Sequence, residues 1–83
     1  MITIHIKIYC REIVKGLEDG DYELPDGATV NDALIEAQRK AGARLSDGAK
    51  NSIVFLLDGR PAELGTPLSD GGKLRILQKV LGG

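Results

Sequence analysis

The sequence holds little of the chemistry on which most enzymes depend. Its 83 residues include one cysteine, one histidine and no tryptophan. A single cysteine excludes an intramolecular disulfide and a cysteine-based metal site, and it suits a reducing compartment. No stretch approaches the ~18 apolar residues of a membrane span. The opening MITIHIKIYCRE lacks the basic and continuous apolar parts of a signal peptide. We therefore expect a cytoplasmic protein.

The chain also lacks an excess of either charge. It has 11 Lys and Arg against 12 Asp and Glu, for a net charge of −1. This balance gives no reason to expect nucleic acid as a partner. At this length we expect one domain over residues 1–83, because a chain this short has no room for separate binding and catalytic domains.

The two side chains most used in catalysis each occur once. His5 falls on the outward phase of an alternating segment, with no oriented partner visible in the sequence. Nothing in the sequence places Cys10 where its thiol pKa would fall. The aspartates stand beside glycine or in turn-like contexts without metal-loop spacing, and neither phosphate-loop motif is present. We therefore expect a protein that is not an enzyme and that holds no metal or cofactor of its own.

Two strands are predicted at the start of the chain. In residues 2–10, isoleucines at every second position alternate with polar side chains, which is typical of a half-buried strand. Residues 22–24 form a short second strand after a turn at Asp19 and Gly20. The two strands are expected to pair as a hairpin with a long loop over residues 11–18.

A helix is predicted next, because its start and stop signals are both present. Thr29 is a good N-cap, and Asp32 three residues later completes a near capping box. Apolar residues recur on one stripe from Val30 to Ala41. Gly42 is a natural residue to end the helix in the left-handed conformation.

The remaining elements are predicted with less regular patterns. IVFLL at 53–57 reads as a strand closed by an Asp58-Gly59 turn. The other expectations are a loop over 43–52, a short strand around Glu63, a 3₁₀ turn near Leu68, and a last strand over 73–81 that runs to Val80 or Leu81. The order β-β-α-β-(short β)-β predicts an α+β, β-grasp fold: a mixed four- to five-stranded sheet with one main helix on one face. The first and last strands would lie side by side in its centre.

One helix covers only one face of such a sheet, so the other face is predicted to be open. Val54, Leu56 and Leu77 would point to that side, with Arg75 and Lys79 at its border. An exposed apolar patch with a basic rim is typical of a protein-docking surface. The alternative is that loop 43–52 or loop 11–18 folds over it.

The chain ends in KVLGG, and the last two residues raise a separate question. Gly82 and Gly83 are either a frayed end or a functional tail. Glycine fits a narrow slot and adopts any backbone angle there, and two residues extend ~7 Å beyond the last strand. Because the chain has no other reactive cluster, we expect the tail to present the Gly83 carboxylate.

The strand order, the ending LSDGGKLRILQKVLGG, the helix start TVNDAL and the turn DGRP together resemble the MoaD/ThiS sulfur carriers, which are ubiquitin-like proteins. The resemblance covers essentially the whole chain. It implies that an activating enzyme of the ubiquitin-activating type uses ATP and Mg²⁺ to adenylate Gly83. A persulfide enzyme would then supply sulfur to form a thiocarboxylate, which a synthase consumes. The resemblance also implies that the carrier docks through the open face, at Leu56, Leu77, Arg75, Val54, Lys79 and Leu81.

The resemblance does not select a pathway. The MoaD branch often has a Pro-Pro pair shortly before Gly-Gly, and this chain has LQKV there. Synthesis of the molybdenum or tungsten cofactor, of thiamine thiazole, and of cysteine or another thio-metabolite all stay open. Two other functions stay open as well: a ubiquitin-like modifier joined to lysines through Gly83, and a β-grasp interaction domain with an incidental Gly-Gly.

Overall fold

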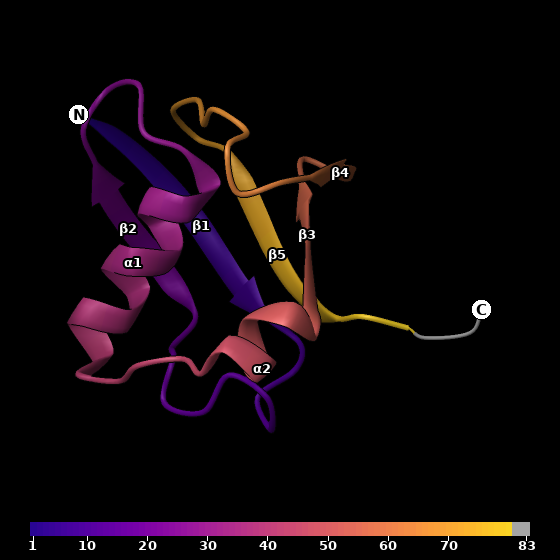
Figure 1. The fold of residues 1–83 in the computed structure, drawn as a ribbon. Coiled ribbons are helices and arrows are strands. Elements are labelled where there is room, and N and C mark those ends of the chain that lie inside the picture. Colours follow the sequence, from indigo (N-terminus) through magenta and orange to yellow (C-terminus); the bar gives the residue numbers. More distant parts are fainter. Residues whose placement is uncertain (81–83) are drawn as a thin grey trace.

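A computed structural model describes residues 1–80 of the chain (Figure 1). Five strands form one sheet in the order β2-β1-β5-β3-β4. The elements are β1 (Ile2–Ile8), β2 (Gly20–Leu24), α1 (Val30–Ala41), α2 (Asp47–Asn51), β3 (Ile53–Leu57), β4 (Arg60–Ala62) and β5 (Lys73–Gln78). The helix α1 crosses one face of the sheet, as Figure 1 shows. The predicted α+β, β-grasp architecture is therefore confirmed.

The centre of the sheet is the parallel pair β1 and β5, and every other pair is antiparallel. The register sets Ile6 beside Leu74 and Ile8 beside Ile76. All four side chains are buried. Because side chains alternate along a strand, one residue of slip would turn these apolar side chains to the opposite face. The predicted neighbourhood of the first and last strands is confirmed.

The core lies between α1 and the inner face of the sheet. Its fully buried large side chains come from β1, β5, α1 and the loop after β1: Ile4, Leu74, Ile76, Val30 and Val14. No described residue with a polar or charged side chain is buried. None of the helices in residues 1–80 has the length and apolar character needed to cross a bilayer.

The predicted caps of α1 are present in the structure. The side chain of Thr29 accepts a hydrogen bond from the Asp32 backbone, and the Asp32 carboxylate accepts one from the Thr29 N–H, which completes a capping box. Gly42 ends the helix at φ 65°, a left-handed conformation that favours glycine. The N-terminus of α1 is therefore fixed in place beside the sheet.

Replacing the cap should lower stability measurably. Thr29→Ala removes the side-chain acceptor of the capping box and should lower the free energy of unfolding by about 1 kcal/mol. Urea denaturation monitored by circular dichroism measures this change. Asn31→Ala, a change at an exposed position in the same turn, is the matched control and should stay within about 0.5 kcal/mol of the parent. An unchanged midpoint for Thr29→Ala would contradict this role.

The segment 43–52, predicted as a loop, contains the short helix α2. Ser46 is its N-cap, and its hydroxyl accepts a hydrogen bond from the Ala49 N–H at 3.1 Å. The prediction was wrong because a helix of five residues buries no side chain of its own and so has no apolar stripe to reveal it. The buried Leu45 just before it anchors this segment to the core.

The short strand was predicted around Glu63 but lies at Arg60–Ala62, directly after the Asp58-Gly59 turn. Residues 66–69 contain no 3₁₀ turn, and the prediction near Leu68 was wrong. The Leu68 N–H instead donates to the Ala28 carbonyl, and Pro67 forms an isolated bridge with Thr29. This loop is therefore shaped by tertiary hydrogen bonds, which local sequence does not encode.

The strand ends also differ from the prediction. The last strand stops at Gln78 rather than at Val80 or Leu81, because β3 begins at Ile53 and leaves no strand residue to pair beyond it. At the same end of the sheet, β1 ends at Ile8 and not at residue 10, and β2 starts at Gly20 and not at residue 22.

Candidate docking face and C-terminal segment

The face of the sheet opposite α1, here called the open face, divides into an apolar part and a basic part. Val54 of β3 lies beside Leu77 of β5, and Leu56 of β3 lies beside Arg75. Arg75 in turn lies beside Lys7 of β1. The row of Leu56 therefore passes from an aliphatic side chain on β3 to cationic ones on β5 and β1, whereas the row of Val54 is aliphatic on both β3 and β5.

The exposures on the open face follow the predicted alternation. Val54 is 40% exposed, whereas its neighbours Ile53 and Phe55 are buried on the helix side. Leu56 and Leu77 are half-buried. Leu57 is half-buried and packs against the core.

The two loops that were the alternative cover for the open face lie elsewhere. Loop 11–18 puts Val14 and Leu17 into the core, and loop 43–52 does the same with Leu45. The two segments also meet each other, because a Cβ added to Gly16 would lie 3.2 Å from the Cβ of Ala43. Figure 1 shows both segments on the helix side, at one end of the sheet. Neither loop shields the apolar part of the open face.

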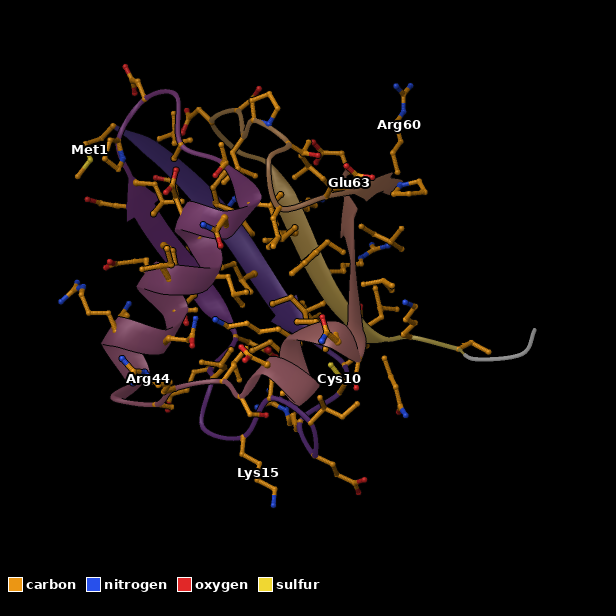
Figure 2. The ribbon with its side chains drawn as sticks, in the orientation of Figure 1. Met1, Cys10, Lys15, Arg44, Arg60 and Glu63 are labelled. Atoms are coloured by element: carbon orange, nitrogen blue, oxygen red, sulfur yellow. The ribbon has the colours of Figure 1, made fainter. Side chains whose placement is uncertain are left out.

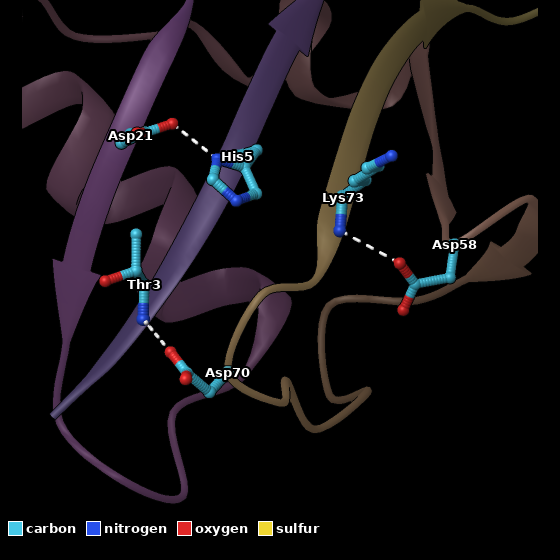
Figure 3. A network of polar contacts seen from close by, with 6 residues as sticks. All are labelled: Thr3, His5, Asp21, Asp58, Asp70 and Lys73. Carbon is cyan, nitrogen blue, oxygen red and sulfur yellow. Dashed lines mark hydrogen bonds and ion pairs between the residues drawn. The ribbon is translucent and has the colours of Figure 1, made fainter.

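Polar contacts on the open face tie turns to strands (Figure 3). The Asp70 carboxylate accepts a hydrogen bond from the Thr3 N–H at 2.8 Å, and the Asp58 carboxylate accepts one from the Lys73 N–H at 3.0 Å. These aspartates therefore have the turn role predicted for them. Sequence reasoning missed the contact between His5 Nδ1 and the Asp21 carboxylate, because it joins two strands through their register. Both side chains are exposed.

A shallow depression of about 390 Å³ lies on the basic part of the open face. Its cationic lining comes from Lys7, Lys73 and Arg75, with the ring of Tyr9 at one end. The Lys7 Nζ lies 5.5 Å from the centroid of the Tyr9 ring, within the range of a cation–π contact. Asp19 and Asp21 also line the depression, so its three cationic side chains stand beside two carboxylates.

Cys10, for which the sequence indicated no reactive thiol, is a core residue. It is 6% exposed, and its thiol donates to the Ile76 carbonyl at 3.7 Å. Burial raises the pKa of the Cys10 thiol, so the reactive thiolate is disfavoured. Figure 2 shows the side chain near the end of β1. Within residues 1–80 no group of three or more His, Cys, Asp or Glu side chains is placed to hold a metal ion.

The C-terminal segment leaves the sheet from its centre. Just after β5, the Lys79 N–H donates to the Ser52 carbonyl at 2.7 Å. Lys79 is exposed, and Val80 is 83% exposed. The remaining predicted site residues, Leu81, Gly82 and Gly83, lie outside the described residues.

Comparison with solved structures identifies the fold. The putative molybdopterin converting factor subunit 1 of Pyrococcus furiosus matches with a TM-score of 0.72 at 21% identity, over 96% of this chain and 100% of that one. The small archaeal modifier protein 1 of Haloferax volcanii matches with 0.73 at 22% identity, over 96% and 100%. Ubiquitin of Caldiarchaeum subterraneum matches with 0.60 at 17% identity, over 99% and 98%.

At these identities the likeness shows the fold, which is the ubiquitin-like β-grasp. It confirms structurally the resemblance seen in the sequence, since a molybdopterin converting factor subunit and a small modifier protein are among the neighbours. No family model matches the chain, and no curated protein matches it.

Proposed function

We propose that this protein is a ubiquitin-like sulfur carrier that bears its sulfur on the C-terminal carboxyl group of Gly83. The observation that supports this most directly is the placement of the apolar part of the open face on β3 and β5. Strand β5 leads directly into the segment that ends in Gly83. A partner that docks on this face would therefore bind close to the start of the tail. The names of the Pyrococcus and Haloferax neighbours point to the same class of small protein.

The chemistry begins with an unreactive carboxylate. In the active site of an activating enzyme, a Gly83 carboxylate oxygen attacks the α-phosphorus of Mg²⁺-bound ATP, and pyrophosphate leaves. The terminal sulfur of an enzyme persulfide then attacks the acyl carbon, and AMP leaves. A thiol reductant cleaves the sulfur–sulfur bond of the resulting acyl disulfide and releases the thiocarboxylate. The enzyme stabilises the developing charge, and the carrier contributes docking and reach.

Docking is proposed on the open face. Leu56 and Leu77 would form the apolar contact, with Val54 at its edge and Arg75 and Lys79 at its charged border. Leu81 would extend the same contact toward the tail. Half-buried aliphatic side chains beside a basic residue match the apolar centre and polar rim of protein interfaces. ATP and Mg²⁺ belong to the partner, and no cofactor is assigned to this chain.

The sulfur acceptor is proposed to be a synthase for which this chain acts as carrier or small subunit. The name of the Pyrococcus neighbour favours synthesis of molybdopterin, for a molybdenum or tungsten cofactor. Thiamine thiazole synthesis is the second candidate pathway. Persulfide enzymes of either pathway would supply the sulfur.

Intact-mass spectrometry tests the proposal. Protein co-expressed with the activating enzyme of its own organism should gain about 16 Da, the replacement of one oxygen by sulfur at an activated acyl group. The same enzyme should catalyse exchange of pyrophosphate into ATP only when this protein is present. If the protein shows no mass gain and supports no exchange, the carrier function is refuted.

A second function is favoured by the modifier protein among the neighbours. In that case the activated Gly83 carbonyl would be attacked by a lysine amine, with loss of AMP or of an enzyme thiol, to give an isopeptide. Peptide mapping of cell extracts would then reveal lysines that carry the C-terminal residues of this chain. Such adducts without a thiocarboxylate would favour the modifier over the carrier.

A further inference from the structure

The dipeptide Asp-Gly, which is chemically fragile, occurs five times in the chain. The five steps are Asp19-Gly20, Asp26-Gly27, Asp47-Gly48, Asp58-Gly59 and Asp70-Gly71. Because glycine has no Cβ, its backbone nitrogen can approach the side-chain carboxyl group of the residue before it. Attack there closes a cyclic imide, which water opens to isoaspartate. All five steps share this local sequence, so only their structural settings distinguish them.

Three of the five aspartate carboxylates accept a hydrogen bond from the backbone of another segment. The pairs are Asp19 with the Ile8 N–H at 2.8 Å, Asp70 with the Thr3 N–H at 2.8 Å, and Asp58 with the Lys73 N–H at 3.0 Å. Figure 3 shows the last two. The glycine after Asp70 is engaged as well, because the Gly71 N–H donates to the Thr3 carbonyl at 2.8 Å. Each carboxylate must lose its bond before it can turn to the glycine that follows it.

The fourth step lies at the start of α2, where helical geometry separates the two reacting groups. Asp47 is the first residue of the helix, and the Ser46 cap holds this turn through bonds from the Ala49 and Lys50 N–H groups. The side chains of a helix point toward its N-terminus, whereas the Gly48 nitrogen lies on the C-terminal side of Asp47. The Asp47 carboxyl group is therefore directed away from Gly48.

The remaining step, Asp26-Gly27, lies in an exposed turn between β2 and α1. Asp26 and Gly27 are the two central residues of this turn, which one hydrogen bond closes, from the Ala28 N–H to the Pro25 carbonyl at 3.1 Å. Gly27 adopts φ 85°, as expected at the third position of a type II turn. Its N–H donates no hydrogen bond to any residue that the structure describes. The attacking nitrogen is therefore free.

The Asp26 carboxylate is restrained only by the end of the chain. Its partner within residues 1–80 is the N-terminal ammonium group of Met1, at 2.9 Å. The Met1 side chain is 66% exposed and the Asp26 side chain 81%. An ion pair this open to water contributes little stability, and chain termini and loop tips are where order is weakest. The carboxyl group can therefore leave the ammonium group for the Gly27 nitrogen at small cost.

We propose that Asp26 is a site of spontaneous isoaspartate formation, and that the fold protects the other four aspartates that precede glycine. The Gly27 nitrogen attacks Cγ of the protonated Asp26 carboxyl group, a nitrogen–carbon bond forms, and the carboxyl OH leaves as water with the proton of that nitrogen. Water then adds to the main-chain carbonyl of the imide and breaks its bond to nitrogen. The main chain now runs through Cγ, and the free carboxyl group is on Cα. The product is a covalent modification that lengthens the connection between β2 and α1 by one carbon.

Ageing of the full-length protein in mildly acidic buffer tests the proposal. Peptide mapping with fragmentation mass spectrometry locates isoaspartate at each of the five steps. In the folded protein Asp26 should isomerise at least ~10-fold faster than each hydrogen-bonded aspartate, the ratio that corresponds to one hydrogen bond to a charged group. Asp47 should also isomerise more slowly than Asp26. In denaturing guanidinium chloride the five rates should become similar, because the local sequence alone then decides them.

Asp26→Glu is the matched variant, because it keeps the charge but its longer side chain closes a larger ring less readily. It should form no isomer at residue 26 and leave the rates at the other steps unchanged. Equal rates at all five steps of the folded protein, or faster isomerisation at Asp58 or Asp70 than at Asp26, would overturn the proposal. So would an Asp26 rate that folding lowers as much as it lowers the Asp58 rate. The measurement uses no activating enzyme, so its failure leaves the carrier function untouched.

Discussion

Deletion of Gly83 is expected to abolish activation by the adenylating enzyme. The shortened chain ends in the carboxylate of Gly82, which lies about 3.5 Å short of the position that the enzyme is built to receive. Displacement of a reacting group by as little as ~1 Å can lower a rate about 100-fold. Pyrophosphate exchange should therefore fall by at least that factor, and the mass gain should disappear.

Deletion of Gly83 should abolish activation without changing the stability of the fold. Among residues 1–80, the hydrophobic core extends from Ile2 to Ile76. We therefore expect loss of Gly83 to change the free energy of unfolding by no more than about 0.5 kcal/mol. Urea denaturation of both proteins measures this. Gly83→Ala, which keeps the length and adds one methyl group, distinguishes reach from steric fit. Exchange that persists at the parent rate in the deletion would show that the reaction does not use this terminus.

Most of the fold could be predicted because its two periodic segments are unusually clear. Alternating isoleucines in β1 identify both the strand and its inner face. Thr29, Asp32 and Gly42 mark the ends of α1 through caps that local chemistry explains. One buried face on the strands and one on the helix leave few ways to form two layers.

The elements that could not be predicted are those that depend on distant partners. The loop around Leu68 takes its shape from bonds to Ala28 and Thr29, and α2 exists because Leu45 anchors the chain before it. The contact of His5 with Asp21 requires the register of β1 against β2. A local pattern contains none of this information, since register and loop contacts form only when the sheet assembles.

The candidate site could also be predicted only in part. The outward direction of Val54, Leu56 and Leu77 follows from alternation, and the structure places all three on the face opposite α1. The half-burial of Leu56 and Leu77 does not follow from alternation, which gives the side of the sheet but not the extent of exposure. A groove of about 530 Å³ between α1 and β3 had no signal in the sequence, since it lies where β4 stops pairing with β3.

The second large effect is expected when Leu77 and Ile76, adjacent residues of β5, are each replaced by aspartate. Leu77→Asp places a charge in the apolar part of the open face and should weaken binding to the activating enzyme by at least ~30-fold, the loss typical of a residue central to an interface. Leu77 is half-buried, so its substitution should lower stability by only about 1 kcal/mol. Ile76→Asp makes the same kind of change one residue earlier. Ile76 is 0% exposed, and a carboxylate buried there without a partner should unfold the domain.

Calorimetric titration with the activating enzyme and urea denaturation measure the two effects separately. Ile35→Asp is the control, because Ile35 is 52% exposed on α1 and lies on the other side of the molecule from the open face. It should keep both affinity and stability. Loss of affinity in Ile35→Asp equal to that in Leu77→Asp would place docking on the helix side. If Leu77→Asp unfolds the protein, the open face contributes to the core. If the variant stays folded but binds the activating enzyme more weakly, the open face is the docking surface.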